Sequence, residues 1–506
     1  MNDNEVGNKY DRQVRLWNPN GQRCLANSSM CLINANTTAS ETLKNLVLPG
    51  VGKLVIVDDG RQTTDQDLAS NFFLRDNAIR SVRAVEMAHT LGQLNPDVHV
   101  EAEIRPLDQL LDEPQYWSQF NCVMVSSFLE SPELHQALSN LLWNQNICLI
   151  EVNSIGFYAT LHIQYKEQDI IETHDNSLDD LRLDLPWPEL QKHIDSIDLD
   201  QLDDQAFSNV PYSIILTKVY QKLVSTSAEF SRPVPSTVRN FVQSELRRTG
   251  DETNLEEACN RAILVLKNSK EIPGNLKEIF EDDELDCGDR FWVLVKALKI
   301  FYNNHGVLPL SGVLPDMESD TVNYMALTKL YREKFNDDKK ELRGYIEDKE
   351  MFTDSELSTF VKNCRYMQVL RGSRKLFSGN LLVENENNPR MIHNLNIYVA
   401  FLAVKSFYER KHRFPNLKDR AKLRTVAISL LCRYQNVKNF PEGLEKVLDE
   451  ICRYNGNEMH NTCALIGGVA AQEVIKVLTN QYVTLDNCLS YDGVNCEVRS
   501  WSIGSS

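Results

Sequence analysis

The sequence predicts an α/β fold that carries a large, mainly helical insertion. Strand and helix patterns alternate through the first third of the 506 residues, the middle is almost entirely helical, and strand patterns return near the end. Regular alternation is typical of a parallel sheet covered by helices. A chain of this length needs more than one compact core. We therefore assign residues 1–165 to the first part of the α/β domain, 166–450 to the helical insert and 451–506 to the returning part.

The α/β domain begins with a βαβ unit. An apolar run at residues 30–34 indicates a buried strand, 40–48 a helix and 53–57 a second strand, followed by Asp58 and Asp59. Dinucleotide-binding units have this layout, and their first turn needs glycines so that phosphate can approach the backbone. Here the turn, Asn-Ala-Asn-Thr-Thr-Ala at residues 34–39, has no glycine. Its Cβ atoms would crowd a pyrophosphate, so either the loop binds something else or a partner binds the nucleotide.

The rest of the chain supplies the expected elements in order. The α/β domain continues with a helix at 79–94, a strand at 98–104, a strand at 121–126, a helix at 133–143, a strand at 147–152 and an antiparallel edge strand at 158–165. The insert contributes helices at 214–224, 238–248, 255–266, 290–303, 325–334, 392–409, 419–434 and 443–454. A helix at 461–478 then begins with small residues that allow close packing, and short strands at 482–485, 488–491 and 496–501 follow.

Composition excludes several classes of protein. A net charge of −17 argues against a nucleic-acid-binding surface. The 12 cysteines include no Cys-x-x-Cys pair, so we expect no zinc site of the usual spacing and no other metal site. We find no signal peptide and no apolar stretch near the roughly 20 residues that span a bilayer. We expect a soluble protein of the cytoplasm and nucleus with reduced thiols and with neither nucleic acid nor membrane as a partner.

The segment Lys-Tyr-Asp-Arg-Gln-Val-Arg-Leu-Trp at residues 9–17 is the first candidate motif. From the residues alone it predicts an amphipathic helix in which Val14, Leu16 and Trp17 pack while Arg12 and Arg15 are solvated. Together with the βαβ unit and with residues 67–74, however, it closely resembles the adenylation domains of ubiquitin-like-protein activating enzymes, a family derived from bacterial ThiF/MoeB-type adenylating enzymes.

Other segments strengthen the resemblance, which runs over nearly the whole chain. Residues 459–476 resemble the returning helix of the family. Residues 177–184, 186–190 and 311–317 resemble one branch, the regulatory subunits of neddylation-activating enzymes. The resemblance implies a Rossmann-like, ThiF/MoeB-type adenylation domain whose helical insert corresponds to a catalytic-cysteine domain without its nucleophile.

The resemblance also implies which functions this chain lacks. The active half of the family has a glycine-rich loop, an acidic ribose-binding residue, a zinc-binding Cys-x-x-Cys pair and a nucleophilic cysteine. Here the loop has no glycine, Asp58 or Asp59 fills the acidic position, and the zinc pair is missing. The insert contains Cys259, Cys287 and Cys364, none in the family's Pro-x-Cys-Thr context or near an activating histidine. We expect no cofactor in this chain, with ATP and Mg²⁺ bound by the partner subunit.

Three residues are the candidates for action across a dimer. In the family the arginine at the position of Arg12 reaches toward the ATP of the other half, a role that suits its fixed charge and forked donors. Arg12 is thus the one catalytic candidate, acting in trans. The apolar pair Phe72 and Phe73 fits either the core of the domain or the dimer interface.

The implied function is that of a regulatory subunit. Its catalytic partner would adenylate the C-terminal glycine of a Nedd/Rub ubiquitin-like protein and bind it as a thioester, for later conjugation to cullins. The ubiquitin-like protein and the conjugating enzyme are the further expected partners. Two alternatives stay open: a free-standing adenylating or Rossmann-type nucleotide-dependent enzyme with a diverged loop, and a non-catalytic scaffold.

Overall fold

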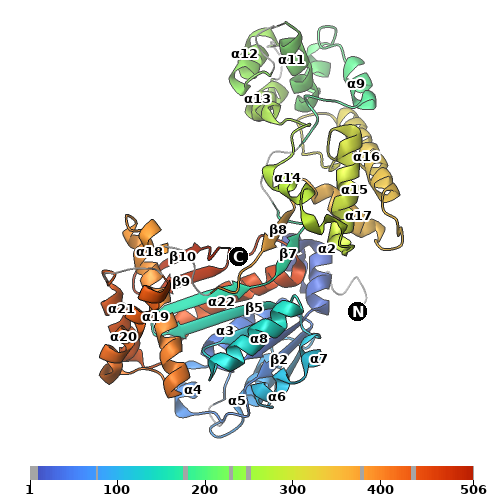
Figure 1. Cartoon of the computed structure of the whole chain (residues 1–506). Helices are drawn as coiled ribbons and strands as arrows, with labels where there is room; N and C mark the ends of the chain where they lie inside the picture. Colours follow the sequence, from blue (N-terminus) through green and yellow to red (C-terminus); the bar gives the residue numbers. More distant parts are fainter. Residues whose placement is uncertain are drawn as a thin grey trace. The chain divides into compact units, whose positions relative to one another are not determined.

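A computed structural model describes residues 9–75, 78–174, 180–226, 232–246, 252–375, 381–434 and 440–504. The chain forms two compact units, one of Met1–Gln168 and Val369–Ser506 and the other of Asp169–Gln368 (Figure 1). Residues 177–179 of the branch-like segment 177–184, and 247–248 of an expected helix, lie outside the described residues.

The first unit is built on an eight-stranded sheet of order β10-β9-β6-β5-β4-β1-β2-β3. Five strands run parallel: β1 (Ser29–Ile33), β2 (Lys53–Val57), β3 (His99–Glu103), β4 (Cys122–Ser126) and β5 (Cys148–Ile155). Three are antiparallel to their neighbours: β6 (Tyr158–Gln164), β9 (Cys488–Asp492) and β10 (Glu497–Trp501). The predicted α/β class is confirmed. The strand at 158–165 is antiparallel but lies inside the sheet, because β9 pairs with its free side, and residues 482–485 form no strand.

Helices cover both faces of the parallel strands, and alternate residues of β1 point to opposite faces. Met30 and Leu32 pack into the core that includes α3 and α22, whereas Cys31 and Ile33 pack on the other side with apolar residues of α6, α7 and α8. Burial on both faces explains the continuous apolar runs of these strands. The helices of this α/β part of the first unit are α2 (Asp11–Asn27), α3 (Thr37–Val47), α4 (Asp65–Ser70), α5 (Arg83–Gly92), α6 (Leu107–Leu111), α7 (Pro114–Trp117), α8 (Pro132–Asn144) and α22 (His460–Thr479).

The helix α22 is the core helix of this unit. By length and composition it is apolar enough to cross a membrane, which corrects the expectation that no stretch has that length, but 61% of its apolar window is buried inside the protein. A Cβ atom at Gly467 would lie 3.0 Å from the Cβ of Glu41 and from the amide of Thr42 on α3. The small residues of α22 therefore do permit the close helix packing that the sequence predicts.

The structure divides the chain differently from the expected boundary at residue 450. The helices α18 (Leu381–Glu384), α19 (Pro389–Lys411), α20 (Arg420–Tyr434) and α21 (Leu444–Tyr454) belong to the first unit (Figure 1). Their apolar residues form one core with Ile155, Tyr158, Cys488 and Trp501 from the antiparallel end of the sheet. Helical periodicity identifies these helices but does not tell which core they cover.

The second unit is mainly helical. It contains α9 (Pro188–Asp195), α10 (Asp204–Ser208), α11 (Tyr212–Thr226), α12 (Pro235–Glu245), α13 (Thr253–Arg261), α14 (Gly274–Phe280), α15 (Arg290–His305), α16 (Thr321–Gly344) and α17 (Asp354–Asn363). The short strands β7 (Glu167–Ile170) and β8 (Gln368–Arg371) pair with each other at the borders of this unit.

Candidate functional site

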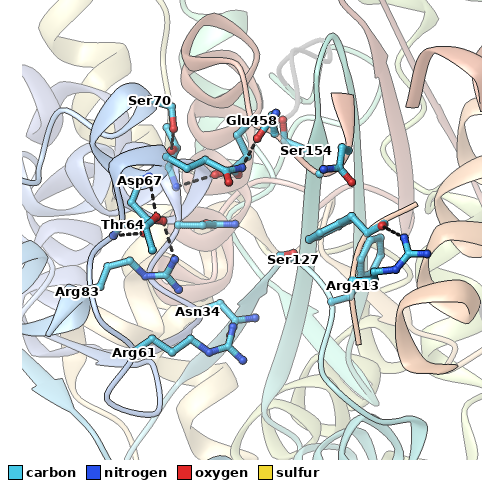
Figure 2. Close-up of a pocket in the computed structure, with 18 of the residues that line it drawn as sticks. Asn34, Arg61, Thr64, Asp67, Ser70, Arg83, Ser127, Ser154, Arg413 and Glu458 are labelled. Atoms are coloured by element: carbon cyan, nitrogen blue, oxygen red, sulfur yellow. Dashed lines mark hydrogen bonds and ion pairs between the residues drawn. The ribbon is translucent and has the colours of Figure 1, made fainter. Parts of the chain in front are cut away.

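A cavity of about 990 Å³ opens where the parallel strands end (Figure 2). In open α/β sheets, ligands bind at this carboxyl edge. The cavity is lined by Asn34, Asn36 and Thr37 from the glycine-free loop, by Arg61 and Arg83 from the segments after β2, by Arg413 from the segment after α19, and by Glu458 just before α22, among others. These residues converge from segments that are far apart in the sequence.

The loop between β1 and α3 is built by asparagines in place of glycines. Asn34 adopts a left-handed conformation with φ 73°, which asparagine tolerates better than most residues. Its side chain donates to the Ser126 carbonyl at 2.9 Å. Asn36 is the N-cap of α3, and its Oδ1 accepts from the Ala39 amide at 2.9 Å and from Ser126 Oγ at 2.6 Å. The turn therefore keeps a strand-to-helix path without glycine.

The side chain of Glu458, from the segment before α22, lies at the N-terminus of α3. Its carboxylate accepts from the Thr37 amide at 2.8 Å, the Thr38 amide at 3.3 Å and Thr38 Oγ1 at 2.6 Å. First-turn amides carry the positive end of the helix dipole, and in dinucleotide-binding units they hold a phosphate. Burial raises the pKa of Glu458, and the hydrogen bonds from Thr37 and Thr38 oppose this rise. A carboxylate of the chain itself thus lies where the fold would place a phosphate.

Every backbone amide of the loop donates within the chain. The Ala35 amide donates to Asp58 Oδ1 at 3.1 Å. The remaining acceptors are the Val57 carbonyl for Asn34, the Asn34 carbonyl for Asn36, Glu458 for Thr37 and Thr38, and Asn36 Oδ1 for Ala39. No amide of residues 34–39, all of which the structure describes, is left for a phosphate.

Asp58, which directly follows β2, has a structural partner. Its buried carboxylate accepts from Arg83 Nε at 2.9 Å and from Arg83 Nη2 at 2.8 Å. Arg83 Nη1 also donates to Asp67 at 2.9 Å, and Asp67 closes a capping box with Thr64 at the start of α4 (Figure 2). The neighbouring Asp59 lies in a turn with φ 47°. Asp58 therefore ties β2, the loop and α5 together.

Comparison with known proteins shows the family to which this chain belongs. The ThiF family model matches residues 10–505. The NEDD8-activating enzyme E1 regulatory subunit of Gallus gallus is 34% identical over 96% of both chains. That of Drosophila melanogaster is 33% identical over 97% of this chain and 96% of its own. The regulatory subunit AXR1 of Arabidopsis thaliana is 31% identical over 97% and 95%.

This chain belongs to the NEDD8-activating enzyme E1 regulatory subunits of the ThiF family. The predicted family resemblance is thereby confirmed over nearly the whole chain. In this regulatory subunit, the three candidates for action across a dimer and the three insert cysteines are placed as follows.

Arg12 lies in the first part of α2, with an exposed side chain. Among the described residues it has no hydrogen-bond or ion-pair partner, and it does not line the cavity. The neighbouring Arg15 pairs with Asp11 at 2.9 Å. Trp17 is buried as expected, but Leu16 is 58% exposed, contrary to the predicted packing. The helix is kinked at Trp17 and Asn18, before a proline, so its apolar positions do not share one continuous face.

The structure separates Phe72 from Phe73. Phe72 is 69% exposed, and its ring centroid lies 4.0 Å from that of His460. Phe73 is half-buried and packs against the core of the first unit. Phe73 therefore contributes to packing within the first unit, whereas Phe72 is an exposed aromatic side chain, and a place for either ring at a dimer interface stays a prediction.

None of the three insert cysteines has the lowered pKa that a nucleophilic thiol needs. Burial raises the pKa of Cys364 to about 12. Desolvation also raises the pKa of the half-buried Cys259 and of the exposed Cys287. Among the described residues, no group of three or more His, Cys, Asp or Glu could hold a metal ion.

Glu458 is the functional residue that sequence reasoning missed. It lies 420 positions from Thr38, in a short segment between two helices. The only local signal is an acidic residue just before the returning helix, which resembles an ordinary helix start. The first turn of α3 contains no acidic residue of its own, and that absence was the available hint that another segment supplies the charge.

Proposed function

We propose that this chain is the non-catalytic subunit of a heterodimeric enzyme that activates a NEDD8-type ubiquitin-like protein. The observation that carries the proposal is the loop at residues 34–39, whose amides are all used internally, with Glu458 at the phosphate position. A subunit of this family that cannot offer its loop to a nucleotide must depend on its partner for ATP and Mg²⁺. The raised pKa values of the insert cysteines likewise support a thioester on the partner.

The partner's chemistry defines what this chain has to support. The C-terminal carboxylate of the ubiquitin-like protein attacks the α-phosphate of ATP and pyrophosphate leaves. A thiolate of the partner then attacks the mixed anhydride and AMP leaves. The product is a thioester that a conjugating enzyme can accept, for later transfer to cullins. Twelve free thiols are in keeping with action in the reducing cytoplasm and nucleus.

Arg12 is the residue by which this subunit acts on the reaction. Its exposed guanidinium has no partner among the described residues, so its forked donors can bind phosphate oxygens on another chain. In the reconstituted pair, Arg12→Ala should lower adenylation at least ~100-fold, the order of loss when a donor to developing charge is removed. Arg15→Ala, on the same helix but paired with Asp11, is the matched control and should stay near wild type.

The test of the proposal is ATP–pyrophosphate exchange with the purified chain, with the catalytic subunit, and with both together. We expect exchange only when the catalytic subunit is present, and thioester formation on that subunit alone. Robust exchange or micromolar ATP binding by the isolated chain would favour a free-standing enzyme and overturn the proposal. If Arg12→Ala leaves adenylation unchanged, the chain is a scaffold that brings partners together without acting on the nucleotide.

A further inference from the structure

The position of Glu458 is fixed by the backbone around it. The Gly156 amide donates to the Asn457 carbonyl at 2.9 Å, and Gly156 forms a parallel bridge with Glu458. Gly156 has φ +58°, and a Cβ atom there would lie 2.2 Å from the ring of Tyr454. The segment before α22 therefore packs directly against the end of β5, which aims the Glu458 side chain at α3.

The surroundings of the Glu458 carboxylate are those of a bound oxyanion. Two successive backbone amides and one hydroxyl donate to its two oxygens, from the first turn of an 11-residue helix. That first turn holds no acidic residue, so the negative charge that complements the helix dipole comes from Glu458. Thr37 and Glu458 both line the cavity of about 990 Å³, whereas Thr38 is buried behind them.

We propose that Glu458 is an internal ligand that takes the place of a phosphate group, and that the first turn of α3 keeps a latent oxyanion site beneath it. The inference rests on the proposed function and deepens it: this subunit excludes nucleotide by occupying the phosphate position itself, in addition to lacking glycines. Removing the carboxylate leaves the Thr37 and Thr38 amides without their acceptor and opens them to the cavity. A small oxyanion such as inorganic phosphate then binds there.

The experiment compares thermal unfolding of the full chain in potassium phosphate and in potassium chloride of equal ionic strength. The variant is Glu458→Ala. The matched control is Glu473→Ala, because Glu473 also accepts from a backbone amide, that of Leu485 at 2.7 Å, but lies inside α22 rather than at a helix N-terminus. Both variants should unfold at lower temperature than the wild type in chloride.

Phosphate should stabilise only Glu458→Ala beyond the general salt effect seen in the wild type. At a phosphate concentration tenfold above the dissociation constant, its unfolding equilibrium constant should fall about elevenfold. Should Glu458→Ala not fold, Glu458→Ser also removes the carboxylate and shortens the side chain, and it should respond to phosphate more than Glu473→Ser. Equal responses of the Glu458 and Glu473 variants overturn the latent site.

The outcome is independent of the enzymatic proposal. Phosphate stabilisation is measured on this chain alone, whereas the regulatory role is measured by exchange in the reconstituted pair. Loss of the phosphate effect with normal exchange refutes only the internal ligand. A phosphate effect in a chain that fails to support exchange refutes only the regulatory role.

Discussion

The salt bridge between Asp58 and Arg83 offers a quantitative test of the site's structural role. Asp58→Asn removes a charge at a carboxylate whose side chain is 0% exposed, opposite a guanidinium that is 12% exposed. The asparagine can keep one acceptor for Arg83 or for the Ala35 amide, but its NH₂ group then faces donors. Leaving a buried charge without its partner costs about 3–5 kcal/mol. Because Asp67 still accepts from Arg83 at 2.9 Å, we expect the lower end, ~3 kcal/mol.

The assay is urea unfolding of the full chain, and the matched control is the neighbouring Asp59→Asn. Asp59 is exposed and asparagine tolerates its positive φ, so this control should stay within ~0.5 kcal/mol of wild type. A double-mutant cycle of Asp58→Asn with Arg83→Met should give a coupling energy of about 2 kcal/mol. A coupling below ~0.5 kcal/mol refutes the reasoning. Loss of adenylation in the reconstituted pair without loss of stability would instead give Asp58 a role in the reaction.

Two further predictions concern the interface and the pH dependence of stability. Phe72→Ala should weaken co-purification with the catalytic subunit while leaving the unfolding midpoint nearly unchanged. Phe73→Ala should mainly lower the unfolding midpoint. Equal effects of the two variants on both measurements would contradict the different environments of the two rings. The hydrogen bond to Asp492 raises the pKa of His393 above 6.5. This pair therefore stabilises the fold fully below pH 6.5 and loses its contribution as pH rises through the raised pKa, so His393→Gln should flatten the decline of the unfolding midpoint with pH.

Local patterns predicted most of the elements because they report burial directly. The strand at residues 53–57 is a continuous apolar run since both its faces are covered, and the helix α5, which precedes β3, shows the expected periodicity. The division of the helical region could not be predicted in this way. The helix α19 covers strands of the first unit, and nothing in a helix's own sequence states which sheet its apolar face will meet.

The candidate residues show the same limit at the level of single side chains. Leu16 was expected to pack, but its side chain is exposed, just before the kink at Trp17 and Asn18. Phe72 and Phe73 are adjacent in the sequence, yet one is exposed and the other packs on the core. The partner of Thr38 lies 420 residues away. Each of these outcomes depends on the path of the backbone or on a distant segment. The spacing of residues along the sequence predicts neither of these.

Glycine loss and internal occupation are two separate barriers to a nucleotide at this loop. Glycine loss acts through sterics, because the side chains of residues 34–39 narrow the approach to the backbone. Glu458 accepts the hydrogen bonds of the Thr37 and Thr38 amides, which a phosphate would need. Its negative charge also repels an incoming anion. Restoring glycines alone would therefore leave the phosphate position filled, and removing Glu458 alone would admit an oxyanion too small to meet the loop's side chains. With both barriers in place, the first-turn amides of α3 are satisfied by the chain itself, so the loop needs no bound ligand to complete its hydrogen bonds.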